Sequence, residues 1–530
     1  MLRVPAVLAL LLQLSAASAQ SLLALDDGAC VFSTTTRACE PAASCSFQFR
    51  FGDLSFDQAC RADVAVVGAT PQQVHLAFAG ESAGTGMTVS WATFSRLEEP
   101  KVWLGAAADV ELAEVGADQV TIQVESYVDG QDTGLSYNYS LFSYHATLSG
   151  LVPHTEYAYQ VGSEAARSNA SSFVTARAAN TTESEDETFE VLIYGDFGAD
   201  ANAAHTLEYL GNLSRSVDFV FHIGDVAYAD NAWLSLSTIL GDFYEELYNR
   251  WMNSLSFLLP SVPYMVLAGN HESECHSPSC FFLPAAAQRR WSNYSALNSR
   301  FKMPSAESGG ASNMWYSFDH GPVHFVAISS ETDFPDAPRN SFLEEEPTGA
   351  RYGGFGDQLA WLEQDLKQAA ANRDATPWII VGMHRAMYTV TSSDESGNPT
   401  GIPATLQAAF EELFIAHSVD VVVAGHVHSY ERQYPIARGK KVADGVSADG
   451  KLYASPQAPV YLLTGAAGNN EGLTSYANAS AESWNVVADD EHYAISSLKA
   501  NRSALAFQLI GTEASALGTV LDEFTITKQA

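Results

Sequence analysis

Five apolar, β-branched segments of this 530-residue chain are each followed by a short polar motif. Such segments predict buried strands, and open α/β sheets place their ligands in the loops at the carboxyl ends of strands. Helical stretches alternate with these strands, which indicates parallel strands buried between layers. The chain is therefore predicted to contain an α/β domain whose polar motifs converge on one pocket. The predicted strands span residues 189–194, 218–223, 263–267, 378–381 and 419–424.

The motifs share residue types that bind metals. Together they supply two carboxylates, a phenol, an amide oxygen and several imidazoles. This set of hard and borderline ligands favours two adjacent transition-metal ions over one structural zinc. One such motif also fits an ordinary turn, but five in order, each after a strand, indicate a catalytic centre. The motifs are Gly195-Asp196-Phe197-Gly198, Gly224-Asp225-Val226-Ala227-Tyr228, Gly269-Asn270-His271-Glu272, Val381-Gly382-Met383-His384 and Gly425-His426-Val427-His428.

The set of motifs resembles that of the purple acid phosphatases, a branch of the dinuclear metallophosphoesterases. The tyrosine of the second motif, Tyr228, separates this branch from its relatives. Other parts of the chain are similar to the long form of the family, so the resemblance runs from about Pro71 to Phe524. It implies an α/β fold in which a four-layer α/β/β/α metallophosphoesterase domain follows an all-β, fibronectin III-like sandwich. The additional parts are residues 71–75, 87–91, 145–148 and 430–432.

The resemblance also implies that two metal ions share the side chain of Asp225 as a bridge. One ion is Fe(III), and its neighbour is a divalent ion of zinc, iron or manganese. Carboxylate and phenolate are hard anionic donors that stabilise a trivalent ion, whereas an amide and two imidazoles suit a divalent one. The implied ligands of Fe(III) are Asp196, Asp225, Tyr228 and His428. Those of the divalent ion are Asp225, Asn270, His384 and His426.

His271 stands beside one of these ligands, and in the family the matching histidine faces the substrate phosphate. We therefore predict that His271 is catalytic. Substrate binding is predicted for Asn270, His271 and Tyr388. Glu272 is a candidate to orient His271. The alternative for His271 is a hydrogen-bonded loop histidine.

The stretch after His384 departs from the family pattern. Plant members carry further histidines there, which help to bind substrate and to protonate the leaving group, whereas the next histidine of this chain is His417. Three candidates remain for the acid that protonates the leaving group: His271, Tyr388 and an acidic residue near Asp394. The substrate range stays open with it.

The implied activity is that of a secreted acid phosphatase, which hydrolyses phosphomonoesters to an alcohol and inorganic phosphate. The expected step is an in-line attack by a hydroxide that the two metals activate. One alternative is a phosphodiesterase or nucleotide hydrolase of the same superfamily. The other is a non-catalytic secreted glycoprotein that binds partners.

The N-terminus has the layout of a secretory signal. Arg3 precedes an apolar run over residues 4–14, and the small residues 17–19 predict cleavage after Ala19. The apolar run is too short to span a bilayer, which needs about 20 residues. The predicted location is secreted and extracellular, with vacuole and lysosome as alternatives. Glycosylation sequons agree with this route, at Asn138, Asn169, Asn180, Asn212, Asn293, Asn478 and Asn501.

Six cysteines in a secreted chain favour disulfides over thiols or metal ligands. Cys275 and Cys280 flank a proline-containing loop, and their short separation predicts a bond between them. A zinc site formed with His271 and His276 is the alternative. The pairing of the four cysteines nearer the N-terminus is not predicted.

Composition divides the chain into successive parts. After the signal, residues 1–19, the predicted parts are a cysteine-rich segment (20–68), the fibronectin III-like sandwich (69–178), an acidic linker (179–187) and the metallophosphoesterase domain (188–530), whose C-terminal strands begin at about residue 431. Within the last part, helices are expected at 242–251, 357–371 and 406–417, with Asp357 as the cap of the second.

The formal net charge of −35 argues against nucleic acid and anionic membranes as partners, because both surfaces demand an excess of lysine and arginine. The expected partners are small-molecule phosphate esters, with no membrane contact after signal cleavage. Because a phosphate ester is itself an anion, its attraction to this acidic protein has to be local, and bound metal cations would supply it. The oligomeric state stays open between monomer and homodimer.

Overall fold

The computed structural model describes residues 69–93, 95–106, 112–127, 141–179, 187–213, 217–230, 244–273, 293–338, 352–394, 397–476 and 483–528. It also describes the short strands β1 (Val31–Ser33), β2 (Ala38–Glu40), β3 (Arg50–Phe51) and β4 (Leu54–Ser55), which pair as β1–β2 and β3–β4. The predicted signal (1–19), the predicted Cys275–Cys280 disulfide and most of the acidic linker lie outside the described residues.

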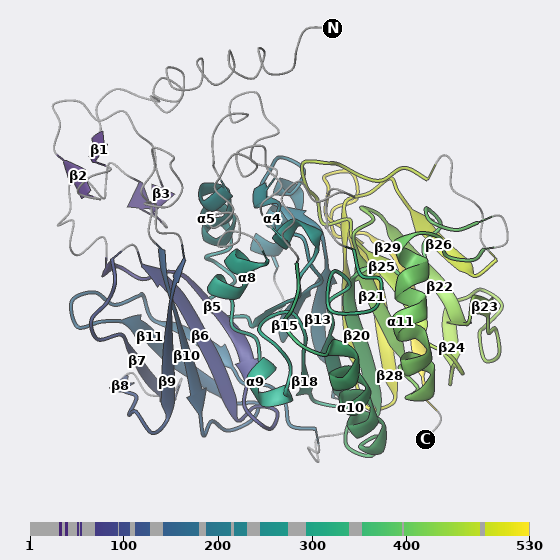
Figure 1. Ribbon diagram of the computed structural model, residues 1–530, viewed down its shortest axis with the longest axis horizontal. Coiled ribbons are helices and arrows are strands. Elements are labelled where there is room, and N and C mark those ends of the chain that lie inside the picture. The colour runs from purple at the N-terminus through teal and green to yellow at the C-terminus, as the bar shows by residue number, and fades with distance from the viewer. Residues whose placement is uncertain are drawn as a thin grey trace, which may run out of the picture.

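A sandwich of two antiparallel four-stranded sheets is formed by strands between Gln72 and Val174 (Figure 1). Trp91 and Tyr144 stack in its core with their ring centroids 5.1 Å apart. One sheet has the order β5 (Gln72–Ala79), β6 (Gly86–Thr93), β10 (Leu141–Ser149), β9 (Val120–Tyr127). The other has the order β12 (Ser171–Val174), β11 (Glu156–Gly162), β7 (Lys101–Ala106), β8 (Ala113–Glu114).

Two larger mixed sheets follow the sandwich. The first has the order β17 (Tyr264–Val266), β15 (Phe219–His222), β13 (Phe189–Tyr194), β27 (Ala494–Ala500), β28 (Ala504–Gly511), β29 (Val520–Thr527), β24 (Leu452–Ala454). The second has the order β18 (Tyr316–His320), β19 (Val323–Ala327), β20 (Trp378–Arg385), β21 (Val421–Gly425), β25 (Val460–Thr464), β22 (Tyr430–Ala437), β23 (Lys440–Lys441), and β26 (Asn485–Asp489) pairs with β22.

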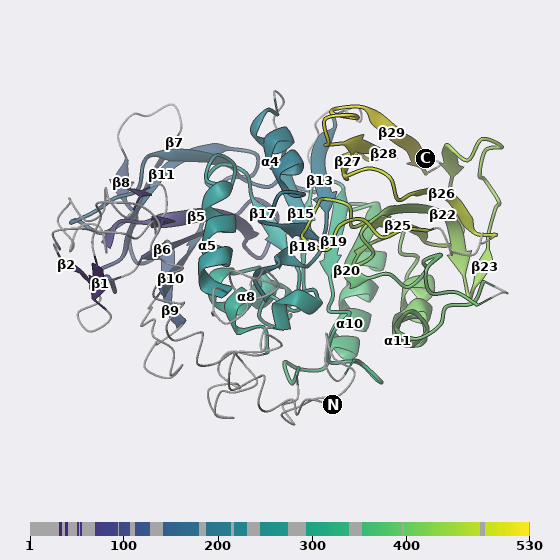
Figure 2. The same ribbon diagram turned by 90° about the horizontal axis from the view of Figure 1, so that it is seen from above.

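Alternate residues of the second sheet face opposite layers, as the pleat of a strand requires. On β20, Ile380 belongs to the core shared with the first sheet, whereas Val381 belongs to a separate core formed with helices. That core includes Leu366 of α10 (Gln358–Ala371) and Phe410 of α11 (Ile402–Ala416). The helices α4 (Ala204–Gly211) and α5 (Tyr244–Ser254) lie beyond the first sheet (Figure 2). The layers are therefore α/β/β/α, as predicted.

The predicted helices are confirmed with shifted ends. The side chain of Asp357 caps α10, because its Oδ1 accepts the N–H of Ala360 at 3.0 Å. The helix α11 begins at Ile402, earlier than predicted, because Gly401 has a φ of 60° and a proline occupies the first turn. Among the described residues, no helix combines the length and the apolar character needed to cross a membrane.

One strand differs from its prediction in a way that bears on the site. The strand β20 does not end at Val381 but continues to Arg385, so His384 lies within a strand and not in the loop behind it. The pairing of β20 with β21 shifts register between Gly382 and Arg385. Such an irregularity changes the direction of the side chains at a strand end, and here it changes the direction of His384.

A half-buried ion cluster joins the second sheet to α10, and its charge leads to a prediction about stability. Nδ1 of His324 on β19 lies 2.6 Å from Oδ1 of Asp319, and its Nε2 lies 3.0 Å from Oδ2 of Asp365. Burial alone would lower the pKa of His324, but the two carboxylates outweigh it and raise the pKa to about 10. The charged imidazole therefore stabilises the fold fully below about pH 6.5, its unfolded value, and this contribution is lost as the pH rises to about 10.

We predict that His324→Gln lowers the melting temperature at pH 6 by several degrees and at pH 10 by much less. Glutamine still forms hydrogen bonds but cannot carry the charge. Thermal unfolding followed by circular dichroism at both pH values tests this, with His492→Gln as a control because His492 pairs with Asp489 nearer the surface. An equal loss at the two pH values would show that packing, and not charge, makes the contribution of His324.

Candidate metal centre

The predicted ligands come from strand ends of both large sheets. Asp196, Asp225 and Asn270 follow strands of the first sheet, whereas His384 and His426 lie at the ends of strands of the second. Two short strands, β14 (Phe197–Gly198) and β16 (Val226–Ala227), pair in parallel directly behind the two aspartates. This pairing holds the two loops with the carboxylates side by side. The centre therefore lies where the strand ends of the two sheets meet.

The backbone at the centre is unusual. Four of the ligand candidates have a left-handed φ, which non-glycine residues adopt at a cost of about 1–3 kcal/mol each. Strain of this kind persists only where the surrounding structure fixes it, and it is typical of functional sites. The φ angles are 63° at Asp196, 54° at Asp225, 53° at Tyr228 and 69° at His426.

A first group of side chains gathers around the phenol of Tyr228. Its hydroxyl lies 3.1 Å from Oδ1 of Asp196 and 2.8 Å from Nε2 of His428. Nε2 of His428 is also 3.3 Å from Oδ1 of Asp196. The other nitrogen of His428, Nδ1, lies 3.0 Å from the carbonyl oxygen of Gly472. Nδ1 therefore carries the proton of the neutral ring, and Nε2 presents its lone pair to the group.

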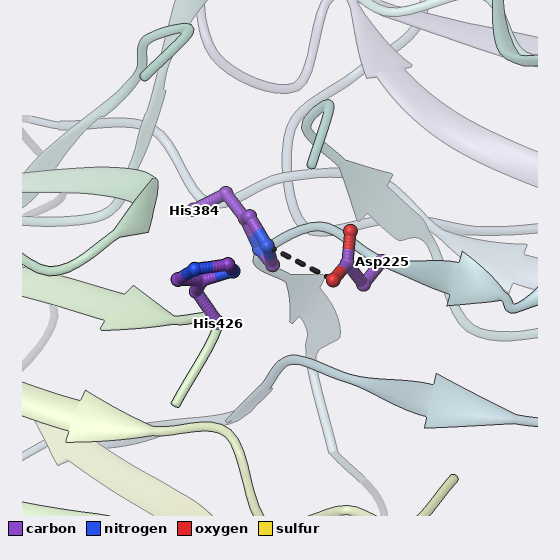
Figure 3. Close-up of side chains that lie close together, drawn as sticks. All are labelled: Asp225, His384 and His426. Carbon is purple, nitrogen blue, oxygen red and sulfur yellow. Dashed lines mark ion pairs between the residues drawn. The ribbon is translucent and has the colours of Figure 1, made fainter. Parts of the chain in front are cut away.

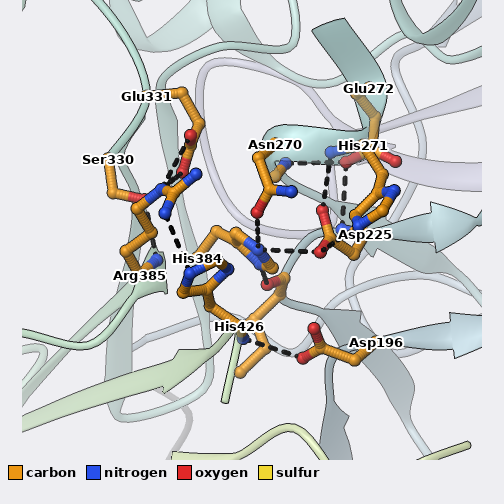
Figure 4. A network of polar contacts seen from close by, with 12 residues as sticks. Asp196, Asp225, Asn270, His271, Glu272, Ser330, Glu331, His384, Arg385 and His426 are labelled. Carbon is orange, nitrogen blue, oxygen red and sulfur yellow. Dashed lines mark hydrogen bonds and ion pairs between the residues drawn. The ribbon is translucent and has the colours of Figure 1, made fainter. Parts of the chain in front are cut away.

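A second group gathers around His384 (Figures 3 and 4). Its Nε2 lies 3.0 Å from Oδ2 of Asp225 and 3.1 Å from Oδ1 of Asn270. Its Nδ1 lies 3.0 Å from the carbonyl oxygen of Ile223. Ligand atoms of Asp225, His384 and His426 all lie within 4.8 Å of one another.

Asp225 belongs to both groups. Its Oδ2 faces His384 and also lies 3.4 Å from the hydroxyl of Tyr228. Its Oδ1 accepts the backbone N–H of His271 at 2.9 Å. The structure thus brings all seven predicted ligands into two adjoining groups with one shared carboxylate.

The donor sets fit two cations. When His384 is neutral, its Nδ1–H donates to the carbonyl of Ile223. The lone pair of its Nε2 then faces two other acceptors, Oδ2 of Asp225 and Oδ1 of Asn270. Burial alone would lower the pKa of His384, but Asp225 outweighs it and raises the pKa to about 9. In a cation-free centre a proton would therefore occupy the place between these acceptors. A metal ion can take that place, because binding to a histidine displaces its proton.

The environment of the Tyr228 phenol also fits a bound cation. Burial, and next the neighbouring carboxylate of Asp196, raise the pKa of Tyr228 well above its usual value. The group stays neutral unless a strong positive charge offsets the two effects. A trivalent ion supplies such a charge, so the set of Asp196, Asp225, Tyr228 and His428 suits a highly charged cation.

His271 lies beside the first group, with its ring centroid 4.2 Å from that of Tyr228. Its Nδ1 is 2.7 Å from Oδ2 of Asp230, and its Nε2 is 3.8 Å from Oδ2 of Asp225. Burial alone would lower the pKa of His271, but the carboxylate of Asp230 outweighs it and raises the pKa to about 10. Asp230 thus orients His271, and it is a residue that the sequence reading missed. Asp230 stands two residues after Tyr228, the last residue of the second motif, and this proximity was the available signal.

The predicted role of Glu272 was wrong. Its carboxylate does not orient His271 but accepts three backbone N–H groups, from Asp225 at 2.9 Å, Val226 at 2.7 Å and Gly269 at 2.7 Å. These bonds tie the loop after β15 to the loop after β17. Glu272 therefore fixes the backbone on which two ligand candidates stand (Figure 4).

The structure does not bring Tyr388 into this centre, so its predicted substrate role is not supported. Its hydroxyl donates to Oε1 of Glu411 at 2.6 Å and accepts from Gln407 at 2.7 Å. Its ring packs on Tyr461 in the core beneath α11. Asp394 is also engaged elsewhere, because it accepts the N–H of Asn398 in a local turn at 3.0 Å. Among the described candidates for leaving-group protonation, only His271 lies in the centre, and Glu395, beside Asp394, lies outside the described residues.

The sequons differ in their surroundings. Asn169 and Asn212 are exposed. Nδ2 of Asn293 instead donates to the carbonyl of Gly353 at 3.1 Å, and its Oδ1 accepts the N–H of Gly353 at 2.6 Å. Asn501 is half-buried and its Oδ1 accepts from Ala504. Asn138, Asn180 and Asn478 lie outside the described residues, as does His276 of the alternative zinc site.

Three family models match successive parts of the chain. Residues 189–430 match the family "Calcineurin-like phosphoesterase", residues 71–175 match "Purple acid Phosphatase, N-terminal domain", and residues 458–523 match "Iron/zinc purple acid phosphatase-like protein C". The solved structure of purple acid phosphatase PPD1 from yellow lupin (Lupinus luteus) has a TM-score of 0.63 at 20% identity, and the match covers 87% of this chain and 75% of that one. That likeness supports the fold.

Two curated relatives extend over most of the chain. Acid phosphatase A of Cryphonectria parasitica is 30% identical over 87% of this chain and 92% of its own length. Human acid phosphatase type 7 is 30% identical over 80% of this chain and 84% of its own length. With three consecutive family matches and a relative of this identity over nearly its full length, the chain belongs to the purple acid phosphatase family.

Proposed function

We propose that this protein is a metal-dependent acid phosphatase that hydrolyses phosphomonoesters to an alcohol and inorganic phosphate. The observation that carries the proposal is the convergence of two ligand groups on Asp225, one around Tyr228 and one around His384. The similarity to proteins named acid phosphatase supports it. The substrates in this proposal are small-molecule phosphate esters.

The two ligand groups differ in charge, and this difference supports a pair of unlike ions. Asp196, Asp225, Tyr228 and His428 would hold Fe(III), because they include the three anionic donors. Asp225, Asn270, His384 and His426 would hold a divalent ion of zinc, iron or manganese. Two such ions, when bound, supply Lewis acidity that polarises phosphoryl oxygens and lowers the pKa of water.

His271 is the proposed catalytic side chain. The carboxylate of Asp230 holds its Nδ1 at 2.7 Å, which fixes the ring and favours its charged form. A charged His271 can donate from Nε2 to the oxygen of the leaving alcohol. As the bond between phosphorus and that oxygen breaks, the bond from water oxygen to phosphorus forms, and the proton neutralises the departing alkoxide. Asn270 has an amide N–H that can also donate to a phosphate oxygen.

We also infer that the protein is secreted through the signal at residues 1–19, with glycosylation at exposed sequons such as Asn169 and Asn212. The formal charge of −35 and the cysteine content support this location. A Cys275–Cys280 disulfide is part of the same inference.

Turnover of a monoester against a diester tests the proposed activity. With p-nitrophenyl phosphate and bis(p-nitrophenyl) phosphate at mildly acidic pH, we expect the higher kcat/KM for the monoester. A chelator should abolish the activity, and iron with zinc should restore it. A preference for the diester would favour the phosphodiesterase alternative, and two bound metals without turnover of either would favour a binding glycoprotein.

His271→Ala should lower kcat for p-nitrophenyl phosphate by about 10²–10⁴-fold, the usual contribution of a positioned acid or base. Metal content should stay at the wild-type level, because His271 is not a proposed ligand. Steady-state kinetics with metal analysis of the same preparation check both points. His417→Ala is the matched control, since His417 follows the end of α11. Loss of metal in His271→Ala would give His271 a structural role instead.

Tyr228→Phe should remove a visible charge-transfer band from the iron-loaded protein while the fold stays intact. A phenolate bound to Fe(III) donates electron density to the metal, and phenylalanine cannot. Absorption spectra of the two proteins check this. Tyr388→Phe is the control, because its phenol is buried away from the centre and its loss should leave the band unchanged. An iron-loaded wild-type protein without the band would contradict the ligand role of Tyr228.

A further inference from the structure

A buried arginine stands at the edge of the second ligand group. Arg385 is the last residue of β20 and directly follows His384. Its Nε lies 2.9 Å from both carboxylate oxygens of Glu331, and its Nη1 lies 2.8 Å from Nε2 of His426 (Figure 4). Its backbone N–H donates to Oγ of Ser330 at 2.8 Å. Only 11% of the Arg385 side chain and none of the Glu331 side chain is exposed.

The contact between Arg385 and His426 is incompatible with a metal-bound histidine. An arginine carries only donors, so Nε2 of His426 has to accept. If a metal ion binds Nε2, Arg385 has to leave that atom. If the ion binds Nδ1, the single proton of the neutral ring sits on Nε2, and two N–H groups face each other. In both cases an N–H of Arg385 is released from His426 when the ion binds.

Charge then determines what the released N–H can meet. Glu331 fixes the position of the guanidinium through Nε, so the group stays beside the centre. The carboxylate of Glu331 balances the charge of Arg385, so the guanidinium can remain beside a bound cation. An anion that binds the second ion can also accept an N–H from Arg385, and a phosphoryl group has oxygens spaced to contact two such partners.

We propose that Arg385 binds a non-bridging phosphoryl oxygen of the substrate, and of product phosphate, at the second ion of the centre. This inference rests on the proposed function. It assigns a substrate contact to the stretch after His384, where the chain has no histidine before His417. Glu331 is the positioning residue that holds Arg385.

The alternative role for Arg385 is to orient His426 without contacting the substrate. The two roles differ in what the loss of Arg385 changes. An orienting residue affects the affinity for the second metal, whereas a phosphate-binding residue affects the affinity for phosphate with the metals in place.

The test measures binding of inorganic phosphate to the metal-loaded, full-length protein by isothermal titration calorimetry. Arg385→Lys keeps a positive charge beside Glu331 but cannot reach both Glu331 and the phosphate, because its donors sit on one nitrogen. If Arg385→Lys folds poorly, the double variant Arg385→Ala with Glu331→Gln takes its place. It removes both charges, so no buried carboxylate is left without a partner. Arg438→Lys is the matched control, since Arg438 is 62% exposed and pairs with Glu412.

In both Arg385 variants we expect the affinity for phosphate to fall by about tenfold to a hundredfold, the usual effect of losing a charge-assisted hydrogen bond. Both metal ions should remain bound, and KM for p-nitrophenyl phosphate should rise more than kcat falls. Wild-type phosphate affinity in these variants, or loss of one metal ion, would overturn the proposal. A wild-type protein that binds phosphate but hydrolyses no monoester would overturn the proposed function, while the phosphate titration would still decide the role of Arg385.

Discussion

The centre depends on hydrogen bonds that hold its carboxylates to the backbone of neighbouring loops. Oδ2 of Asp196, from the first sheet, accepts the N–H of His426, from the second, at 2.9 Å. Nδ1 of His384 lies 3.0 Å from the carbonyl of Ile223 across the same boundary. Glu272 joins two loops of the first sheet through three N–H groups. These bonds hold Asp196, Asp225 and His426, three of the four left-handed residues, in place.

The two-layer arrangement of sheets explains why the ligands meet. The strands that carry the ligands are buried along nearly their whole length, between the other sheet on one face and helices on the other. The carboxyl ends of β13, β15, β17, β20 and β21 lie together, so the five motifs at these ends surround one space. The sandwich packs against the outside of this assembly, where Gln73 donates to Asn249 of α5 at 2.8 Å and Tyr159 donates to the carbonyl of Pro260 at 2.7 Å.

Local sequence patterns were sufficient to predict the strands, the α10 cap and the convergence of the ligands. Each of these depends on neighbours in the chain or on a motif directly behind a strand. The partners of polar groups were not predictable in this way. His271 pairs with Asp230, 41 residues away, and Tyr388 turns to Glu411 on a helix packed behind the sheet. Arg385 is an ordinary residue in the sequence, and only the contact with His426 distinguishes it.

The origin of the ligands in two sheets has a consequence for the order of events during maturation. Neither sheet alone presents a full set for either ion, because Asp196 and Tyr228 come from one sheet and His428 from a loop of the other. Tight capture of metal therefore has to follow the docking of the two sheets, and the binding free energy stabilises only the docked state. A chain whose two sheets are docked wrongly would separate the two halves of each ligand set, so it would gain none of this stabilisation from metal ions.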